Sequence, residues 1–470
     1  MLRATKIAEE NGIPGVAIVS TGFMKQARAT ARAMGVPDIS IAEYPGVIPM
    51  DSADVLADKV WNAVVPSVVK SLSTNTTASA AEAAEPGVRD IVFSGTLDEV
   101  QEHFDAREWS DGLPVVPPTQ DRVDTFLAWT DRDPGEVIGV LPPEFREATV
   151  WSVAVNGVMA GCRAEYMPIL LGIVDAIADP AFHLEDAGST PGWEPLVVVS
   201  GDLVDALEFN TEVGNMKVGR RANASIGRFL RMYMRNVAGF RPGSTDKGSI
   251  GFTFNVAMGE NEGAIKDLGW DPVRVDLGFK QEDNVVMVQS AVAISAPVYS
   301  GGTDPETLAR PLVRYMTGAA GPWNFTAMWW GEWYPLIQMS PAVARGFADL
   351  GWGKKEIRRH LFQNCKMSAW WMEHYPLAVA GKEVPLADVV ARGAAPALYA
   401  ESDDPQRLVP MLLREEWTSI VVAGDPGRNQ SRIYINNQRQ GAPVARRIGL
   451  PVGWRERIKR SLPRSRTDRT

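Results

Sequence analysis

The chain has 470 residues, of which 45% are hydrophobic and 22% charged, a balance typical of a globular protein with about two to four domains. Its net charge of -9 excludes a nucleic-acid binder that relies on overall positive charge. Two cysteines are too few for a secreted disulfide scaffold, so we expect a reducing, cytoplasmic compartment. The four histidines lack metal-ligand spacing, and the sequence predicts no metal site and no evident cofactor.

The sequence also gives no sign of membrane insertion. The first ten residues are mixed and charged, unlike a signal peptide. No run of about 18 apolar residues occurs, so no transmembrane helix and no membrane partner are expected.

Residues 1–72 predict a truncated Rossmann-like parallel α/β unit, because helical and short apolar segments alternate. The expected elements, in chain order, are a helix end at 4–11, a strand at 16–19, a helix at 21–33, a strand at 39–41 and a helix from Asp51 that is kinked at Pro66. Two parallel strands cannot bury both faces of a sheet or pair both edges. This unit must therefore dock on the rest of the chain, on another subunit or on residues upstream, and an oligomer is expected.

A Ser/Thr/Ala/Glu-rich linker at 73–88 separates this unit from a larger α/β or α+β domain at 89–450. A basic tail at 451–470 is expected to be a solvated terminus, or else a weak contact for an anionic partner or lipid. The elements expected in the large domain are helices at 96–103, 150–178 (interrupted near Gly161 and Pro168) and 222–237, strands at 195–200, 285–296 and 419–424, and a Pro-rich extended segment at 109–119.

The segment 210–262 combines glycine, arginine and asparagine more densely than the rest of the chain. Arg221 and Arg228 are seven residues apart and can share a helix face, while Asn223 or Ser225 could cap that helix. Such a helix start with two guanidinium groups favours a small anionic substrate. The alternative is a surface loop whose arginines pair with glutamates.

Candidate residues for a reaction follow from this pattern. The candidate catalytic residues are Cys162, Glu165, Glu260 and Glu262, and the candidate substrate-binding residues are Asn156, Arg221, Asn223, Arg228 and Asn261. A reactive thiol needs nearby positive charge, which Arg163 could supply, although a buried, inert Cys162 is the stronger interpretation. A glutamate such as Glu260 could act as acid or base if burial raised its pKa.

Two further features stand out. The loop 423–429 follows an expected strand, where ligand loops gather in α/β sheets, although it lacks a known phosphate-binding pattern. Six tryptophans concentrate in two short regions and indicate a core or a subunit interface, or alternatively an aromatic ligand wall. They are Trp323, Trp329, Trp330, Trp333, Trp370 and Trp371.

The segment ENGIPGVAIVSTGFMKQARATARAMGVPDISIAEYPGVIP resembles the C-terminal half of UGSC (seleno)proteins. The matching positions are Gly12-Ile13-Pro14, Thr21, Phe23, Ala31 to Gly35 with Pro37, and Tyr44-Pro45. In that family a Sec/Cys-Gly-Ser-Cys motif lies just upstream, which implies thiol or selenol redox chemistry. The motif is absent from this chain, so another polypeptide supplies it, translation starts further upstream, or the function is lost.

The large domain looks like a companion family often found with such domains. The matching blocks are WSDGLPVVPPT (109–119), VNGVMAGCRAEYMP (155–168), GRRANASIGRFLRMYMRNVAGFRPG (219–243), GENE (259–262) and VVAGDPGRN (421–429). The chain departs from a related Gly-Gly-Pro-Gly-Lys-His block, where it has Asp425, Arg428 and Asn429, and the lost histidine argues against an acid-base role there.

The leading hypothesis is a thiol- or selenol-linked redox enzyme, or its large subunit, that binds a small anionic substrate. Its partner would be a UGSC/CGSC-motif protein or a missing N-terminal segment. The alternative is a non-catalytic binding or assembly subunit of a larger complex. A hydrolase would need a nucleophile and a base that the sequence does not reveal.

Overall fold

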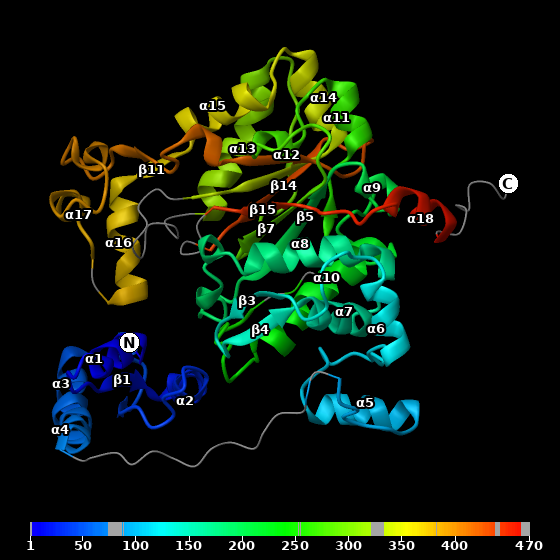
Figure 1. Cartoon of the computed structure of the whole chain (residues 1–470). Coiled ribbons are helices and arrows are strands. Elements are labelled where there is room, and N and C mark those ends of the chain that lie inside the picture. The colour runs from blue at the N-terminus through cyan, green and yellow to red at the C-terminus, as the bar shows by residue number, and fades with distance from the viewer. Residues whose placement is uncertain are drawn as a thin grey trace.

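The computed structural model describes residues 2–73, 87, 89–251, 253, 255–320, 333–381, 383–437 and 442–461. The fold is α/β, with mixed sheets surrounded by helices (Figure 1). The expected linker lies almost wholly outside the described residues, as do Trp323, Trp329 and Trp330.

The N-terminal unit follows the expected helix–strand order. It consists of α1 (Leu2–Glu10), β1 (Ala17–Ser20), α2 (Met24–Ala33), β2 (Ile41–Tyr44), α3 (Ala53–Lys59), a π-helical turn (Val60–Val64) and α4 (Val65–Ser73). β1 and β2 pair in parallel from Ala17–Ile41 to Ser20–Tyr44 and form a sheet of two strands. The second strand runs three residues beyond its expected end because Ala42 and Tyr44 pack under the helix that follows.

The first sheet of the large domain has the strand order β15-β7-β5-β6. Its strands are β5 (Glu194–Ser200), β6 (Met258–Gly259), β7 (Val285–Ala291) and β15 (Val444–Arg447). β5 is parallel to β6 and antiparallel to β7. The sheet's outer residues, Val197 and Val199 among them, pack on α7 (Val150–Met159), α8 (Met167–Ile177) and α10 (Arg221–Tyr233) to form the largest core.

The second sheet is ordered β13-β10-β14-β8, with β9 also paired to β14. Its strands are β8 (Ala293–Ile294), β9 (Val298–Tyr299), β10 (Leu336–Met339), β13 (Ser419–Val422) and β14 (Gln430–Ile435). β10 and β13 are parallel. The outer face of this sheet packs on α13 (Pro305–Ala320), α14 (Pro341–Asp349) and α15 (Lys354–Asn364), and Trp333 is buried in this core as expected for a packing role.

A third, smaller core joins the two sheets. It takes alternate residues of β5 and β7 from one sheet and of β10, β13 and β14 from the other, such as Val198, Met287 and Val421. Backbone hydrogen bonds connect the sheets on both sides, from Asn261 N–H to the Val422 carbonyl (2.8 Å) and from Val292 N–H to the Ile435 carbonyl (2.8 Å). The carboxyl ends of β5, β6, β10 and β13 therefore meet at one end of the large domain.

The remaining elements cover these layers. They are α5 (Leu97–Ala106), α6 (Gln120–Leu127), β3 (Val137–Leu141), β4 (Arg146–Thr149), α9 (Leu203–Ala206), α11 (Glu262–Leu268), α12 (Val273–Asp276), β11 (Lys366–Ser368), α16 (Ala369–Ala380), α17 (Leu386–Ala391), β12 (Leu408–Pro410) and α18 (Trp454–Ser461). No single helix in the described ranges is long and apolar enough to cross a membrane, although one sharply bent pair, 164–177 with 180–186, meets that test by length and composition.

The structure corrects two local expectations. Neither Asn223 nor Ser225 caps α10, because the helix already begins at Arg221 and its N-cap, Arg220, makes no side-chain capping bond. The first half of the basic tail is ordered, because α18 buries Trp454 and Ile458 in the largest core. Trp370 and Trp371 lie on α16, and both are about two-fifths exposed with stacked rings.

The N-terminal unit forms a lobe below the large domain and touches it at only a few points (Figure 1). Gln26 donates to the Thr245 carbonyl (3.2 Å), and the Lys247 ammonium lies 5.4 Å from the centre of the Phe23 ring. Helix α16 lies beside the short turn Ile48–Met50. The unit therefore docks on the rest of the chain without being enclosed by it.

Candidate functional site

The structure places the candidate residues in two groups. Asn156, Cys162, Glu165, Arg221 and Arg228 lie where α7 ends beside α10. The other candidates, except Asn223, lie at the carboxyl end of β6.

Arg221 closes the end of α7. Its Nε donates to the Gly161 carbonyl (3.0 Å) and its Nη2 to the Cys162 carbonyl (3.4 Å). These two residues directly follow α7, at a turn where Gly161 adopts a left-handed conformation (φ 76°). Arg221 therefore has a structural role at this turn. Its side chain is also exposed to solvent, and a role in anion binding stays a prediction.

Arg228 clamps the Pro-rich segment that crosses α10. It makes a bidentate pair with Asp111 (2.9 and 2.7 Å) and also donates to the carbonyls of Leu113 and Pro114. Burial alone would raise the pKa of Asp111, but the hydrogen bonds and charge of Arg228 outweigh it and hold that pKa below its usual value. The guanidinium fork is thus engaged within the protein.

Neither cysteine has the surroundings of a reactive thiolate. Cys162 is 5% exposed, and its Sγ donates to the Ser225 carbonyl (3.2 Å). Burial raises its pKa to about 12, despite the opposing effects of that bond and of Arg221 and Arg228. Cys365, the chain's other cysteine, is fully buried and its pKa is raised by burial to about 12. Both thiols are protonated at neutral pH.

The remaining candidates near α7 and α10 have internal partners. Asn156 donates to the Ser152 carbonyl and accepts from Asn236 (both 2.9 Å). Glu165 pairs with Arg163 at 3.4 Å. Asn223 is fully buried, accepts from Asn210 N–H (2.8 Å) and donates to the Ala257 carbonyl (3.0 Å), and thereby fixes the 210–220 loop to α10.

Glu260 and Glu262 lie in a buried polar network at the strand ends. Glu260 is fully buried, accepts from the Ser200 hydroxyl (2.8 Å) and Val273 N–H (2.9 Å), and lies 3.6 Å from the Lys354 ammonium. Glu262 accepts from Gly201 N–H (2.6 Å) and from Arg274 (2.7 Å). The Arg274 guanidinium also donates to Ser200 (2.9 Å), which links the two carboxylates.

The network extends to α12 and α15. Lys354 donates to Asp276 (3.0 Å), which also receives Arg358 (2.7 Å). Burial raises the pKa of Glu260, with the repulsion of Glu262 in the same direction, while Lys354 and the hydrogen bonds to Ser200 and Val273 oppose it. A carboxyl with these neighbours can hold a proton, but the network also ties the strand ends to two helices.

Sequence reasoning did not identify Ser200, Arg274 or Lys354, which lie up to 94 positions from the two glutamates. The sequence pattern indicated this region only by the expected end of a buried strand at Ser200. Asn261 has a local role, because its side chain caps α11 by accepting from Ala264 N–H (2.9 Å).

The two loops singled out in the sequence meet beside this network. Gly424 N–H donates to the Thr211 carbonyl (2.9 Å), and the Gln338 amide donates to Asn215 (3.0 Å) and to the Ala423 carbonyl. The Asn215 amide nitrogen is buried and makes no hydrogen bond. The start of the 423–429 loop is therefore adjacent to the 210–220 loop, and its role beside a ligand site stays a prediction.

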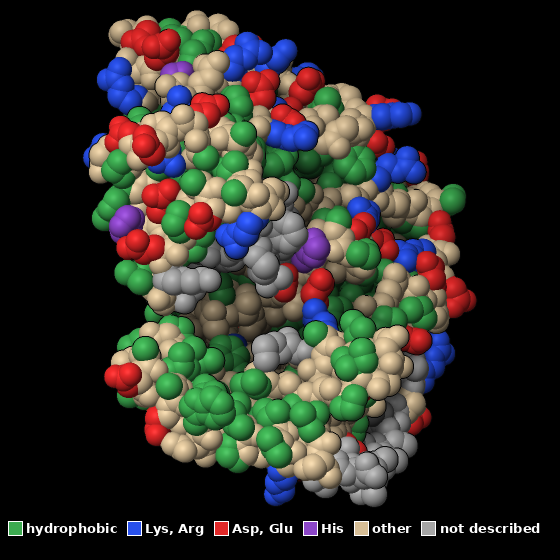
Figure 2. Space-filling view, turned by 90° about the vertical axis from the view of Figure 1, so that its left-hand side faces the viewer, with side chains coloured by type: hydrophobic (Ala, Val, Ile, Leu, Met, Phe, Trp, Pro, Cys, Tyr) green, Lys and Arg blue, Asp and Glu red, His purple; other side chains and the backbone are tan. Residues whose placement is uncertain are grey.

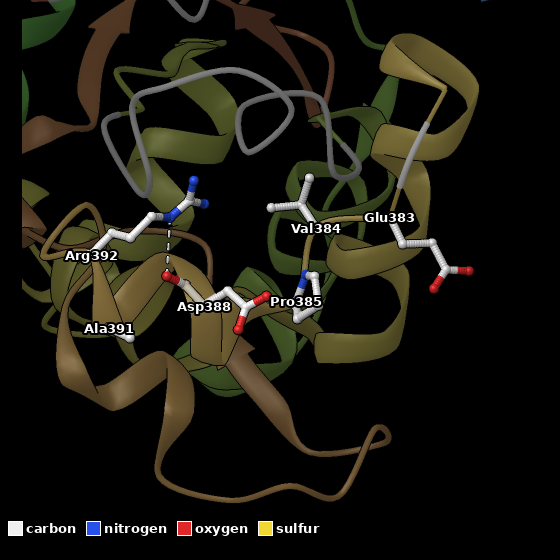
Figure 3. Close-up of a pocket in the computed structure, with 6 residues that line it drawn as sticks. All are labelled: Glu383, Val384, Pro385, Asp388, Ala391 and Arg392. Atoms are coloured by element: carbon white, nitrogen blue, oxygen red, sulfur yellow. Dashed lines mark hydrogen bonds between the residues drawn. The ribbon is translucent and has the colours of Figure 1, made fainter. Parts of the chain in front are cut away.

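Neither a metal-binding group nor a surface hollow coincides with the candidate residues in the part of the chain that the structure describes. In that part no three His, Cys, Asp or Glu side chains are arranged to hold a metal ion. A shallow hollow beside α17 is lined by Glu383, Val384, Pro385, Asp388, Ala391 and Arg392, and by none of the candidate residues (Figure 3). A second lies between α1, the end of α2 and Phe145.

The N-terminal unit has its own polar cluster at the strand ends. The Thr21 hydroxyl donates to Glu43 (2.6 Å), and the Tyr44 hydroxyl donates to Asp51 (2.5 Å), which also receives Lys59 (2.7 Å). Burial and then Asp51 raise the pKa of Tyr44 to about 12. Hydrogen bonds from Lys59 and Tyr44 lower the pKa of Asp51. Two of the residues that carry the family resemblance, Thr21 and Tyr44, thus help to hold the strand ends together.

The same unit exposes many large apolar side chains. On the sheet and the turns around it, Ile18 is 40% exposed, Phe23 38% and Met50 82%. Both outer edges of β1–β2 lack a paired strand among the described residues. Its main apolar cluster lies between β2 and α3–α4, and Ala17 of β1 with Ala27 and Ala31 of α2 are buried as well.

Comparison with known proteins bears on this unit. Residues 4–74 match the model of the UGSC family. No curated protein and no solved structure matches the chain. Which half of the UGSC domain is represented, and the resemblance of the large domain to a companion family, stay predictions. The chain carries a UGSC-family segment at residues 4–74, in the unit built on β1 and β2.

Proposed function

We propose that this chain is the larger subunit of a thiol- or selenol-linked redox assembly, and that a partner polypeptide carrying the UGSC/CGSC motif completes the β1–β2 sheet. The observation that carries the proposal is the two-stranded parallel sheet with unpaired outer edges and an exposed Ile18. Parallel sheets are stable when helices cover both faces and further strands pair their edges.

The state of the chain's own thiols supports an external redox group. Cys162 and Cys365 are buried and protonated, whereas thiol exchange requires an accessible thiolate. The reactive sulfur or selenium would then come from the partner. Strand addition to an exposed sheet edge is an established mode of polypeptide recognition, in which backbone hydrogen bonds provide affinity.

The test is a calorimetric titration of the full chain with a UGSC/CGSC-motif polypeptide from the same genome. We expect saturable binding that is weakened at least about tenfold by Ile18→Lys, because a charge would be buried in the completed sheet. Ile250→Lys is the matched control, since Ile250 is 98% exposed in the large domain. A partner with its motif cysteines replaced by serine should still bind.

Two results would count against the proposal. Absence of binding, or equal loss in both lysine variants, would contradict completion of the sheet. Binding without thiol–disulfide activity of the complex would contradict the redox role and favour the alternative, a non-catalytic assembly subunit.

A further inference from the structure

The helical segment from α3 through the π-helical turn to α4 has two apolar stripes. The inner stripe contains Val60, Val64 and Val68, and it packs on Ala42 and Tyr44 of β2. It contributes to the small core of the N-terminal unit. Its spacing of four residues is typical of the buried face of a helix.

The outer stripe is largely exposed to solvent, with Val65 half-buried. It runs through Trp61, Val65, Val69 and Leu72, with exposed fractions of 69% for Trp61, 59% for Val69 and 51% for Leu72. These spacings of four, four and three place the side chains on one side of the helix. Figure 2 shows hydrophobic side chains gathered over the lobe that this helix covers. A helix face exposed to water would normally be polar.

The charges on the helix suggest what covers the stripe. Asp54 and Asp58 lie at its start, where Lys59 is already paired with Asp51, and Lys70 lies near its end. Trp61 and Val69 lie four residues on either side of Val65, and Asp58 and Lys70 lie six on either side of Val64. An antiparallel pair of two such helices would therefore set Trp61 against Val69 and the acidic end against the basic end. A parallel pair would bring like charges together.

We propose that this outer stripe is a self-association surface, on which a second copy of the chain docks its own α3–α4 helix antiparallel about a two-fold axis near Val65. Such an isologous contact is the commonest arrangement of homodimers. A tryptophan buries about 150–250 Å². The stripe alone thus falls short of the roughly 800 Å² per subunit of a standard interface, so the dimer is weak and reversible. This inference does not depend on the proposed redox role.

The experiment is sedimentation velocity of the full chain across a wide concentration range. We expect a monomer–dimer equilibrium in the natural chain. Trp61→Asp and Val69→Lys should each weaken it at least about tenfold, because each buries a charge at both contacts of the two-fold. Val218→Lys, at a position 76% exposed in the large domain, is the control and should dimerise normally.

Mixing the two variants tests the antiparallel geometry. In a mixed dimer the introduced aspartate of one copy faces the introduced lysine of the other, and the opposite contact keeps Trp61 against Val69. Dimerisation should recover in the mixture. Each variant must show the circular dichroism and melting of the natural chain, and Trp61→Asp should still bind the UGSC/CGSC-motif polypeptide.

Three outcomes would overturn the inference: a natural chain that stays monomeric at every concentration, variants that dimerise like the natural chain, or a mixture that does not recover. Loss of partner binding with intact self-association would instead contradict the proposed function alone.

Discussion

The N-terminal unit and the large domain are built from the same kinds of element but differ in how completely they are buried. The large domain has two sheets, each covered by helices on its outer face and joined by a shared inner core. The N-terminal unit has two strands and only a small apolar cluster, between β2 and α3–α4. Helices and strands can thus form locally while the burial that stabilises them comes from elsewhere.

The polar groups differ in a parallel way. In the large domain, charged side chains such as Arg274 and Lys354 are buried with internal partners and fix elements to one another. In the N-terminal unit, apolar side chains are exposed to solvent and the outer strand edges have no paired strand among the described residues. The charged groups of the first region are paired internally, whereas the second region leaves apolar side chains and strand edges exposed.

Removing one charge from the strand-end network should have the largest effect on stability. We expect Lys354→Met to lower the free energy of unfolding by about 3–5 kcal/mol, because Glu260 would keep a buried charge without its cation. Urea unfolding measures it. Lys355→Met is the matched control, since Lys355 is exposed, and it should change stability by less than about 0.5 kcal/mol.

The pH dependence of that variant sharpens the prediction. The pKa of Glu260 is raised in the folded state, so the cost of its charge appears as pH rises through that pKa and disappears below the unfolded value of about 4.3. The deficit of Lys354→Met should shrink as pH falls, and adding Glu260→Gln should restore part of the stability. A pH-independent deficit would contradict this assignment.

Arg228→Met should have a smaller effect, about 1.5–3 kcal/mol, because it leaves Asp111 without its bidentate donor. The lowered pKa of Asp111 gives stability that is present above the unfolded pKa of about 3.9 and is lost as pH falls through the folded value. The natural chain and the variant should therefore converge in acid. An unchanged stability at pH 7 would favour a ligand-binding role for Arg228 over the structural one.

Deleting residues 1–86 should change the large domain little. The contacts between the two regions are few, so we expect its unfolding free energy to shift by about 1 kcal/mol or less. Differential scanning calorimetry of both chains would show it. A collapse of the main transition would mean that the two regions share one core.

The smallest expected effect is on thiol chemistry. Neither cysteine should react with Ellman's reagent in the native chain at pH 8, because both thiols are buried with pKa values near 12. Both should react after unfolding in urea. Rapid reaction of either thiol in the native state would contradict this prediction, and rapid reaction of Cys162 would restore it as a candidate redox residue.

The sequence predicted local features well. The strands at β5 and β13 and the helices around α7 and α10 follow from apolar runs and helix punctuation. The open two-stranded unit also follows, because it depends only on the order of short elements.

The candidate site was harder to predict, because its contacts link distant segments. Arg221 and Arg228 share a helix, but their partners at 161–162 and 111–114 depend on how α7 and the Pro-rich segment pack on it. Asn223 has capping chemistry yet lies inside α10, where it binds the 210–220 loop. Glu260 meets Lys354 only because α15 packs against the strand ends.

The most direct test of an incomplete sheet is hydrogen exchange of the amides in residues 15–23 and 39–46, with and without the UGSC/CGSC-motif polypeptide. We predict fast exchange of these amides in the chain alone, much faster than in β5 and β7, and strong protection on adding the polypeptide. Exchange as slow as in β5 without any partner, or no change on its addition, would contradict the account.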